Sequence, residues 1–492
     1  MDARVTRRSF LKAAGVGAAA LAAPRWLRAA AGGGDAKPFD EAQGRPNFIV
    51  IFADDQGYGD MACYGSKTLK TPNWDRMAAE GMKLTDFYVT APVCTPSRSS
   101  LMTGCYPRRI GLHQHVLFPN SKKGLNPDEI TIAEVLKARG YATACVGKWH
   151  LGFQQKFLPT RQGFDTYYGI PFSNDMALPA GMAYAKDAKL PADFPDETRQ
   201  KGENKRNVVP LMRDEEVIEY PADQATLTER YTEEVIRFIT ANKDRPFFVY
   251  LPHTMCHYPL HVSDKFKGTS GAGLFGDVIA GMDWSTGEIL KALQRLGLDE
   301  KTLVIYTSDN GAAAGSSAPL RGKKGSVWEG GMREPCLVRW PGKVPAGSVC
   351  SEVATIMDLL PTLAGLAGAK VPADRVIDGK DIWPLLSARP GAKSPYEAFF
   401  YHTSQGQLAG VRSGKWKLLV QVPAARRAKP KKGEKPAPQP KPPAAALYDL
   451  QADLTESQNV ADEHPDVVQR LQELLAKFDA DIKANSRPVG TP

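Results

Sequence analysis

The sequence contains no Cys-x-x-Cys pair among its seven cysteines, which are Cys63, Cys94, Cys105, Cys145, Cys256, Cys336 and Cys350. The absence of that spacing argues against a zinc ribbon. In an oxidising compartment, an odd number of cysteines leaves at least one without an intramolecular partner. Cys94 is a candidate for that unpaired cysteine.

Long hydrophobic runs are also missing. A weakly apolar, Ala- and Gly-rich stretch of about a dozen residues follows Arg7, Arg8 and Lys12 and ends near Ala29–Ala31, short of the ~20 residues needed to span a bilayer. This pattern is typical of a twin-arginine export signal over residues 1–31. We therefore expect the twin-arginine translocase as a partner, a periplasmic or secreted location in a bacterium, and a mature protein that does not span the membrane.

The body of the protein has little net charge. The formal charge is +9, but residues 1–31 contribute +5 and the Lys/Pro-rich residues 424–443 contribute +6, which leaves −2 for the remainder. This balance provides no electrostatic argument for a nucleic-acid partner. The chain also shows no internal repeats.

Short apolar runs that end abruptly in polar residues are present instead. Four such runs stand before Asp54-Asp55, Lys148-Trp149-His150, His253 to His257, and Asp309-Asn310. Continuous apolar runs of this length fit strands that are covered on both faces. Amphipathic helices are predicted between them over residues 126–140, 223–242 and 276–297, with Pro127 near the start of the first. The alternation predicts a doubly wound, mostly parallel α/β sheet.

The pattern changes after about residue 370. EAFFYHTSQGQLAGVRSGKWKLLVQ has short alternating runs around a Ser-Gly turn, which predicts an antiparallel hairpin. The C-terminal part is predicted to contain one more strand, in ALYDL, and a helix within residues 463–485. The apolar stripe of this helix is expected to pack on a sheet. We expect a linker over 32–45, a large domain over 46–370, and a smaller α+β domain over 371–492 with a Lys/Pro-rich surface loop at 424–446.

The polar ends of the four runs predict one site, because ligands bind beyond the carboxyl ends of the strands in such sheets. Carboxylate and amide oxygens suit Ca²⁺ or Mg²⁺ rather than zinc, although a single Asp pair is more often a helix cap or a solvated turn. Lys148 and His150 lie two residues apart and point to one side of an extended chain, which suits an anionic substrate and proton transfer. The predicted lining is Asp54, Asp55, Lys148, His150, His257, Asp309 and Asn310.

The segment VCTPSRSSLMTG spans residues 93–104. Pro96 stands where the first residue of a helix would be, so Cys94 would face a helix N-terminus, which favours anions. Arg98, one turn along, adds a charge that can hold a tetrahedral oxyanion. Four states of Cys94 remain open: a thiolate nucleophile, a buried thiol, half of a disulfide, or the precursor of another group. The spacing alone favours the disulfide.

CTPSRSSLMTG resembles the signature of the type I, formylglycine-dependent sulfatases, within the alkaline phosphatase superfamily. Cys94, Pro96, Arg98, Thr103 and Gly104 match its pattern. Further blocks similar to this family follow the expected order: NFIVIFADDQGYGD, GKWHLG, HYP, SDNG and GKKGSVWEGGMREP. GIPFSND resembles a block of the arylsulfatase A branch. The resemblance covers residues 46–370, with a weaker echo in GVRSGKWKLL and LYDL.

The resemblance implies an alkaline-phosphatase-like fold and a sulfuric ester hydrolase of the arylsulfatase type. A formylglycine-generating enzyme would oxidise Cys94 to the aldehyde Cα-formylglycine, which hydrates to a diol. One diol oxygen would attack sulfur and form a covalent sulfo-enzyme intermediate, and the other would expel sulfate. The substrate would be a sulfated small molecule or glycan.

The resemblance also implies a role for each matching residue. Asp54, Asp55, Asp309 and Asn310 would hold Ca²⁺, in preference to Mg²⁺, together with modified residue 94. Arg98 and Lys148 would neutralise the nucleophile and the transition state, and Lys148 would also bind substrate. His150 would take the proton that drives sulfate release. His257 and Lys324 would bind sulfate, one of them would protonate the leaving alcohol, and Ser173 would support substrate binding.

Two alternatives stand beside this hypothesis. A phosphate or phosphonate ester hydrolase of the same superfamily can share the modified cysteine. A binding protein for sulfated glycans without catalytic activity is a different class, but the presence of a residue at every catalytic position argues against it. His253 matches no catalytic position of the family.

Overall fold

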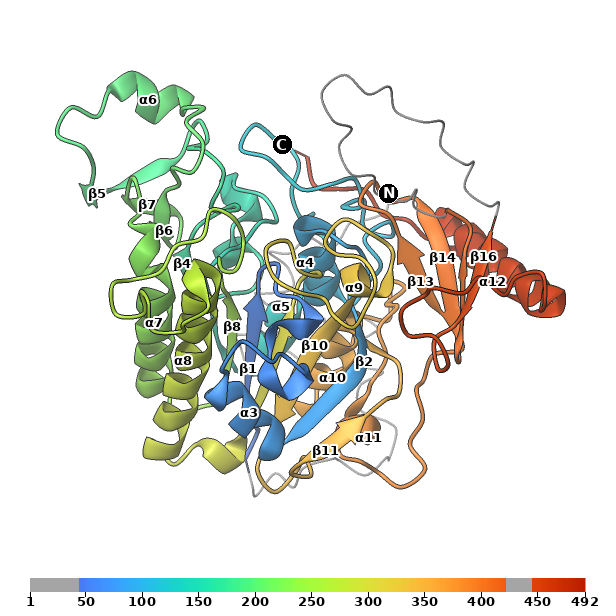
Figure 1. Cartoon of the computed structure of the whole chain (residues 1–492). Helices are drawn as coiled ribbons and strands as arrows, with labels where there is room; N and C mark the ends of the chain where they lie inside the picture. Colours follow the sequence, from blue (N-terminus) through green and yellow to red (C-terminus); the bar gives the residue numbers. More distant parts are fainter. Residues whose placement is uncertain (1–43, 422–444, 492) are drawn as a thin grey trace, which may run out of the picture.

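A computed structural model of the chain describes residues 44–421 and 445–491 (Figure 1). The predicted export signal lies outside these residues, as does nearly all of the predicted Lys/Pro-rich loop. Among the described residues, no helix combines the length and the apolar composition needed to cross a membrane.

The large sheet is mixed and mostly parallel, and it is built from β1 (Asn47–Ala53), β2 (Met82–Tyr88), β3 (Ala142–Val146), β4 (Thr166–Gly169), β5 (Ala183–Lys189), β6 (Leu211–Arg213), β7 (Glu216–Glu219), β8 (Phe247–Pro252), β9 (Thr302–Ser308), β10 (Arg333–Arg339), β11 (Ser348–Cys350) and β12 (Ala354–Thr355). The strand order is β11-β2-β10-β9-β1-β8-β3-β4-β6-β7-β5, with β12 beside β2. Because β9, β1, β8, β3 and β4 run parallel, their carboxyl ends meet at one edge. The predicted fold class and its four apolar strands, β1, β3, β8 and β9, are confirmed.

Alternate residues of β1 face two separate cores. Phe48, Val50 and Phe52 pack into a core with α4 (Cys94–Thr103), α5 (Ile132–Lys137) and α10 (Leu359–Leu366). Ile49 and Ile51 pack into the other core with α3 (Pro72–Ala79), α7 (Leu227–Ala241) and α8 (Gly273–Arg295). Helices therefore cover both faces of the sheet, as Figure 1 shows.

The predicted helix over 126–140 is shorter than expected. Its helical residues are α5, Ile132–Lys137, because Thr131 rather than the region of Pro127 caps the start. The Thr131 side chain accepts a hydrogen bond from the Glu134 backbone N–H, and the Glu134 side chain accepts one from the Thr131 backbone N–H. This reciprocal cap satisfies two donors that would otherwise lack partners.

The C-terminal part holds a four-stranded antiparallel sheet in the order β13 (Phe399–His402), β14 (Leu408–Ser413), β15 (Trp416–Leu419) and β16 (Ala446–Asp449). Helix α12 (Pro465–Ala484) covers it, with Leu471 and Leu475 packed against Val411, Leu418 and Leu447. The predicted hairpin, the further strand and the sheet-facing apolar stripe are confirmed.

The remaining elements are short. The α-helices are α6 (Asp196–Lys201), α9 (Glu329–Met332) and α11 (Trp383–Leu386), and the 3₁₀ turns are η3 (Tyr58–Asp60), η4 (Ala62–Tyr64), η5 (Gln155–Phe157), η6 (Pro159–Arg161), η7 (Gln224–Thr226), η8 (Asp299–Lys301) and η9 (Ile356–Asp358).

Candidate active site

The register of the central strands brings the predicted acids together. Ala53 at the end of β1 pairs with Ser308 at the end of β9, so the residues that follow, Asp54 and Asp309, are neighbours. The Asp309 backbone N–H donates to the Ala53 carbonyl at 3.2 Å. Asp55 has φ of 64°, and this turn lets its backbone N–H donate to Asp309 Oδ1 at 3.1 Å.

A buried acidic cluster results at this edge of the sheet. One ligand atom from each of Asp54, Asp55, Asp309 and Cys94 lies within 4.8 Å of the others. Asn310 Nδ2 donates to Asp55 Oδ1 at 2.8 Å, whereas Asn310 Oδ1 is buried with no hydrogen-bond partner. The four oxygen-bearing residues of the predicted metal set are therefore together, and one amide oxygen remains available for a ligand.

The electrostatics of this cluster fit a cation. Burial, followed by the charge of Asp54, raises the pKa of Asp309 to about 6. Burial also acts to raise the pKa of Asp54, but Lys148 and Arg98 outweigh it and hold that pKa well below its usual value. A divalent cation among these oxygens would reduce the repulsion that raises the pKa of Asp309.

Helix α4 places Cys94 and Arg98 at the cluster. Cys94 is the first helical residue, because Val93 is the extended residue that precedes the helix. Pro96 is the third helical residue, so its predicted place at the first position is wrong. The missing N–H of Pro96 costs nothing there, since the first N–H groups of a helix have no partner within it.

The state of Cys94 excludes the disulfide and disfavours the thiolate nucleophile. All seven cysteines lie within the described residues and are free, so the disulfide favoured by spacing alone is absent. Burial, together with the negative charge of Asp309, raises the pKa of the Cys94 thiol well above its usual value. An unmodified thiolate nucleophile is therefore disfavoured at neutral pH.

Three cations face the acids and residue 94. Arg98 bonds Asp309 Oδ2 through Nη2 at 2.7 Å, and Lys148 Nζ bonds Asp54 Oδ2 at 2.6 Å. Lys324 Nζ lies 2.6 Å from Asp55 Oδ1. The Nζ atoms of Lys148 and Lys324 approach Cys94 Sγ at 3.5 and 3.6 Å respectively. The three positive charges match the three carboxylates, so a divalent cation would make the site positive toward a sulfate group.

His150 is buried with one ring nitrogen satisfied. Its Nε2 lies 2.9 Å from the Leu117 carbonyl, which assigns the proton to Nε2 because a carbonyl only accepts. Its Nδ1 is buried without a hydrogen-bond partner and is left as an unprotonated lone pair. Burial, then Lys148 and Arg98, hold the pKa of His150 well below its usual value, so the ring is neutral at pH 7.

His257 and Ser173 contact the acids and Lys148. His257 Nε2 is 3.7 Å from Asp55 Oδ2, and its Nδ1 bonds the Tyr258 carbonyl at 2.6 Å. Ser173 Oγ lies 3.3 Å from Lys148 Nζ and 3.2 Å from His257 Nδ1. Burial lowers the pKa of His257 despite the nearby Asp54 and Asp55. Every residue of the predicted site is therefore gathered at this edge.

Sequence reasoning missed the residues that fix these side chains. Asn174 Oδ1 lies 3.1 Å from His257 Nδ1. Thr95 Oγ1 donates to the His150 carbonyl at 2.9 Å and accepts from the Leu117 N–H at 3.1 Å. Thr95 and Asn174 lie within CTPSRSSLMTG and GIPFSND, two blocks that resemble the family, and each is adjacent to a predicted site residue. His253 is buried at the end of β8, where burial lowers its pKa to about 4.

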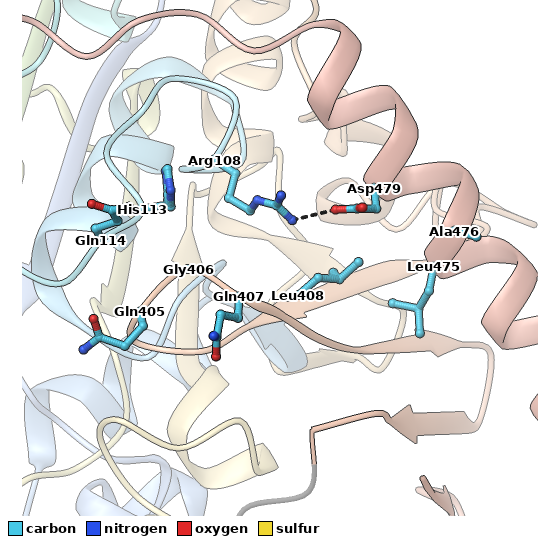
Figure 2. Close-up of a pocket in the computed structure, with 10 residues that line it drawn as sticks. All are labelled: Arg108, His113, Gln114, Gln405, Gly406, Gln407, Leu408, Leu475, Ala476 and Asp479. Carbon is cyan, nitrogen blue, oxygen red and sulfur yellow. Dashed lines mark hydrogen bonds and ion pairs between the residues drawn. The ribbon is translucent and has the colours of Figure 1, made fainter. Parts of the chain in front are cut away.

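A separate cavity of 660 Å³ lies between the segment after α4 and the C-terminal sheet (Figure 2). Figure 2 shows Arg108 reaching Asp479 of α12, at 2.9 Å between Nη1 and Oδ1. None of its lining residues belongs to the acidic cluster: Arg108, His113, Gln114, Gln405, Gly406, Gln407, Leu408, Leu475, Ala476 and Asp479.

The family follows from comparison with known proteins. Residues 46–369 match the sulfatase family model. The chain belongs to the sulfatase family. In this sulfatase, residues 323–425 match the model of the N-sulphoglucosamine sulphohydrolase C-terminal region, and residues 394–490 match the C-terminal region of aryl-sulfatase.

Named relatives of this sulfatase agree with the family. Arylsulfatase A of Homo sapiens is 39% identical over 471 residues, which cover 89% of each chain. Steryl-sulfatase of Mus musculus is 38% identical over 457 residues, covering 79% of this chain and 73% of that protein. A crystal structure of Ps i-CgsB in complex with k-i-k-neocarrahexaose has a TM-score of 0.73 and 30% identity, covering 88% of this chain and 92% of that one. Hydrolysis of a sulfuric ester is therefore the reaction class of this sulfatase.

Proposed function

We propose that this sulfatase hydrolyses O-sulfate esters through a hydrated formylglycine made from Cys94, with a bound Ca²⁺. The observation that carries the proposal is the position of Cys94. It lies at the start of α4 with its Sγ within 3.6 Å of two lysine Nζ atoms and 3.5 Å from Asp54 Oδ1. A diol at residue 94 supplies two oxygens at this point, whereas a thiol of raised pKa supplies a poor nucleophile.

Asp54, Asp55, Asp309 and Asn310 are the residues that would hold Ca²⁺. The crowding of three buried carboxylates and the unpartnered Asn310 Oδ1 both fit a hard cation. When bound, Ca²⁺ supplies Lewis-acid polarisation of the sulfate oxygens.

Side chains of the site neutralise charge and transfer protons. Arg98, Lys148 and Lys324 neutralise the charge that develops on the sulfate oxygens, and Ser173 orients Lys148. His150 accepts the proton that drives sulfate release, because its Nδ1 is unprotonated and has no hydrogen-bond partner. Lys324 Nζ, or Nε2 of a His257 ring that carries a proton on both nitrogens, donates a proton to the departing alcohol.

The wider setting of the enzyme is part of the same proposal. We place the protein in the periplasm or outside the cell after twin-arginine export, with formylglycine formed by a formylglycine-generating enzyme. The substrate is a sulfated small molecule or glycan. The structural relative in complex with neocarrahexaose supports the glycan class.

Peptide mass spectrometry across residue 94 tests the modification. We expect an aldehyde in place of the thiol in active protein, and loss of turnover in Cys94→Ala. Active protein with an unmodified Cys94, or full turnover by Cys94→Ala, would contradict the mechanism. Sulfate and phosphate esters of one alcohol should be compared on the same preparation, because faster phosphate turnover would favour the phosphate or phosphonate ester hydrolase.

Removal of the metal tests the acidic cluster. We expect a calcium chelator to abolish turnover of 4-nitrophenyl sulfate and added Ca²⁺ to restore it. Metal removal should also lower the melting temperature, because an ion that binds only the folded state stabilises it. The variant Asp309→Asn should bind Ca²⁺ more weakly in calorimetry. An unchanged melting temperature and undiminished turnover after dialysis against chelator would overturn the metal assignment.

A further inference from the structure

Two exposed aromatic residues are sequence neighbours of residues that contact the candidate active site. Among the described residues, the exposed large hydrophobic side chains are Phe118, Tyr258, Leu274, Val349 and Val376. The two aromatic members, Phe118 at 48% and Tyr258 at 54% exposure, each directly follow a residue that bonds the site. Large aromatic side chains placed in water beside a polar centre are typical of binding surfaces.

The backbone beside Phe118 is held by the site. Leu117 donates its N–H to Thr95 Oγ1 at 3.1 Å, and its carbonyl accepts from His150 Nε2 at 2.9 Å. Because consecutive Cα atoms are about 3.8 Å apart, Phe118 begins one residue from these contacts. Its ring stacks on His115, with centroids 5.9 Å apart and 24° between the planes.

The backbone of Tyr258 is held in the same way from the other side. His257 Nδ1 bonds the Tyr258 carbonyl at 2.6 Å, and Asn174 Nδ2 donates to the carbonyl of Pro259 at 2.8 Å. A His257 ring nitrogen, a carboxylate oxygen of Asp55 and Cys94 Sγ all lie within 4.8 Å of one another. Tyr258 is therefore an exposed ring on a backbone anchored one residue from the sulfate-binding groups.

We propose that Phe118 and Tyr258 bind the organic part of the substrate, and that this part presents a ring with an apolar face, either an aryl ring or the C–H face of a sugar. The proposal rests on the proposed sulfatase function and adds the residues that select the leaving group. The buried charges recognise only the sulfate group, so affinity for the rest of the substrate requires apolar surface close to them. Such contacts strengthen substrate binding without touching the reacting sulfur.

The test measures KM and kcat for 4-methylumbelliferyl sulfate in Phe118→Ala, Tyr258→Ala and the double variant. We expect KM to rise about 3- to 10-fold for each single substitution with little change in kcat, since these contacts are made equally in the ground and transition states. Inhibition by inorganic sulfate, which has no ring, should keep its inhibition constant. Phe118→Tyr should keep the original KM because it retains the ring.

Val349→Ala is the matched control, since Val349 is 60% exposed but lies on β11, the terminal strand of the large sheet. An unchanged KM in the double variant, an equal rise in the Val349→Ala control, or an equal change in the sulfate inhibition constant would overturn the inference. Absence of sulfate-ester turnover by the unsubstituted protein would instead overturn the proposed function. Repeating the measurement with a 6-sulfated hexose distinguishes the ring classes, because a KM rise with only one substrate identifies the ring that the surface selects.

Discussion

At the scale of single residues, neighbours in the sequence have very different environments at the site. Lys324 reaches Asp55 and Cys94. Burial acts against its charge, but the carboxylates of Asp55, Asp54 and Asp309 together with Cys94 outweigh burial and keep the lysine pKa well above its usual value. Lys323, the adjacent residue, donates to the Gly315 carbonyl instead. The sequence KK alone does not distinguish the two. Only the family resemblance pointed to Lys324.

We predict that Lys324→Ala lowers kcat/KM for 4-nitrophenyl sulfate by about 10²- to 10³-fold, the usual cost of removing one group that stabilises a developing negative charge. Lys323→Ala is the matched control and should stay within about 2-fold, because exposed polar contacts contribute little. Steady-state kinetics of the two variants side by side provide the measurement. Equal losses of kcat/KM in both variants would show that turnover depends on the loop as a whole and not on the charge of Lys324.

At the scale of elements, the end of β13 buries a titratable group away from the site. His402 is fully buried, and its ring lies 5.4 Å from Tyr106 and 6.0 Å from Phe478 of α12, centroid to centroid. Burial, with Arg108 and His113 adding to it, lowers the pKa of His402 to about 3. The alternating pattern of the predicted hairpin identified this strand. It did not reveal that α12 and the segment after α4 would close over the strand's last residue.

His402 predicts a loss of stability in mild acid. In the unfolded chain the histidine binds a proton below about pH 6.5, whereas in the folded protein it stays neutral down to about pH 3, so the unfolded state gains protons first. The free energy of unfolding should therefore fall by about 2 kcal/mol between pH 7 and pH 5 from this group.

Urea unfolding at pH 5, 6 and 7 measures this slope. His402→Leu should flatten this slope, whereas His464→Gln, a change at a partly exposed histidine whose ring lies 4.7 Å from that of Trp416, should leave it as it is. The same slope in His402→Leu and in the unsubstituted protein would refute the assignment.

At the scale of the whole molecule, a buried ionic network joins the C-terminal sheet to the loop that carries Lys324. Lys417 of β15 donates to Glu329 Oε1 and to the Val327 carbonyl, both at 2.9 Å, and lies 2.7 Å from Glu456 Oε1. Glu456 Oε2 in turn accepts from the Glu329 N–H at 2.7 Å. Burial opposes ionisation of Glu329, but Lys417, Arg333 and Arg412 together outweigh burial and lower the pKa of Glu329 to about 2. The C-terminal sheet therefore holds the 324–329 segment in place.

We predict that Lys417→Met destabilises the protein by about 3–5 kcal/mol, because it leaves the buried Glu456 without its cation and Glu329 with only Arg333, at 3.4 Å. It should also lower kcat, since the loop that bears Lys324 loses its anchor. Lys415→Met, which removes a more exposed pair with Asp449 on the same strand region, should cost less than about 1 kcal/mol. Chemical denaturation and 4-nitrophenyl sulfate kinetics measure both effects. A Lys417→Met variant as stable as Lys415→Met would contradict the role of the network.

Sequence pattern by itself determined the fold class, the four central strands and the edge at which the site lies, because buried parallel strands need continuous apolar runs and their polar ends must meet. It also led to the family through local motifs such as the one around Cys94. Features that depend on the distance between residues far apart in the sequence could be read only from the tertiary structure. These include the absence of a disulfide at Cys94, the free Nδ1 of His150, the anchoring of the Lys324 loop by Lys417, and the place of Phe118 and Tyr258 beside the site. Burial and electrostatic shifts depend on packing from every side, and neighbours along the chain supply only a part of that packing.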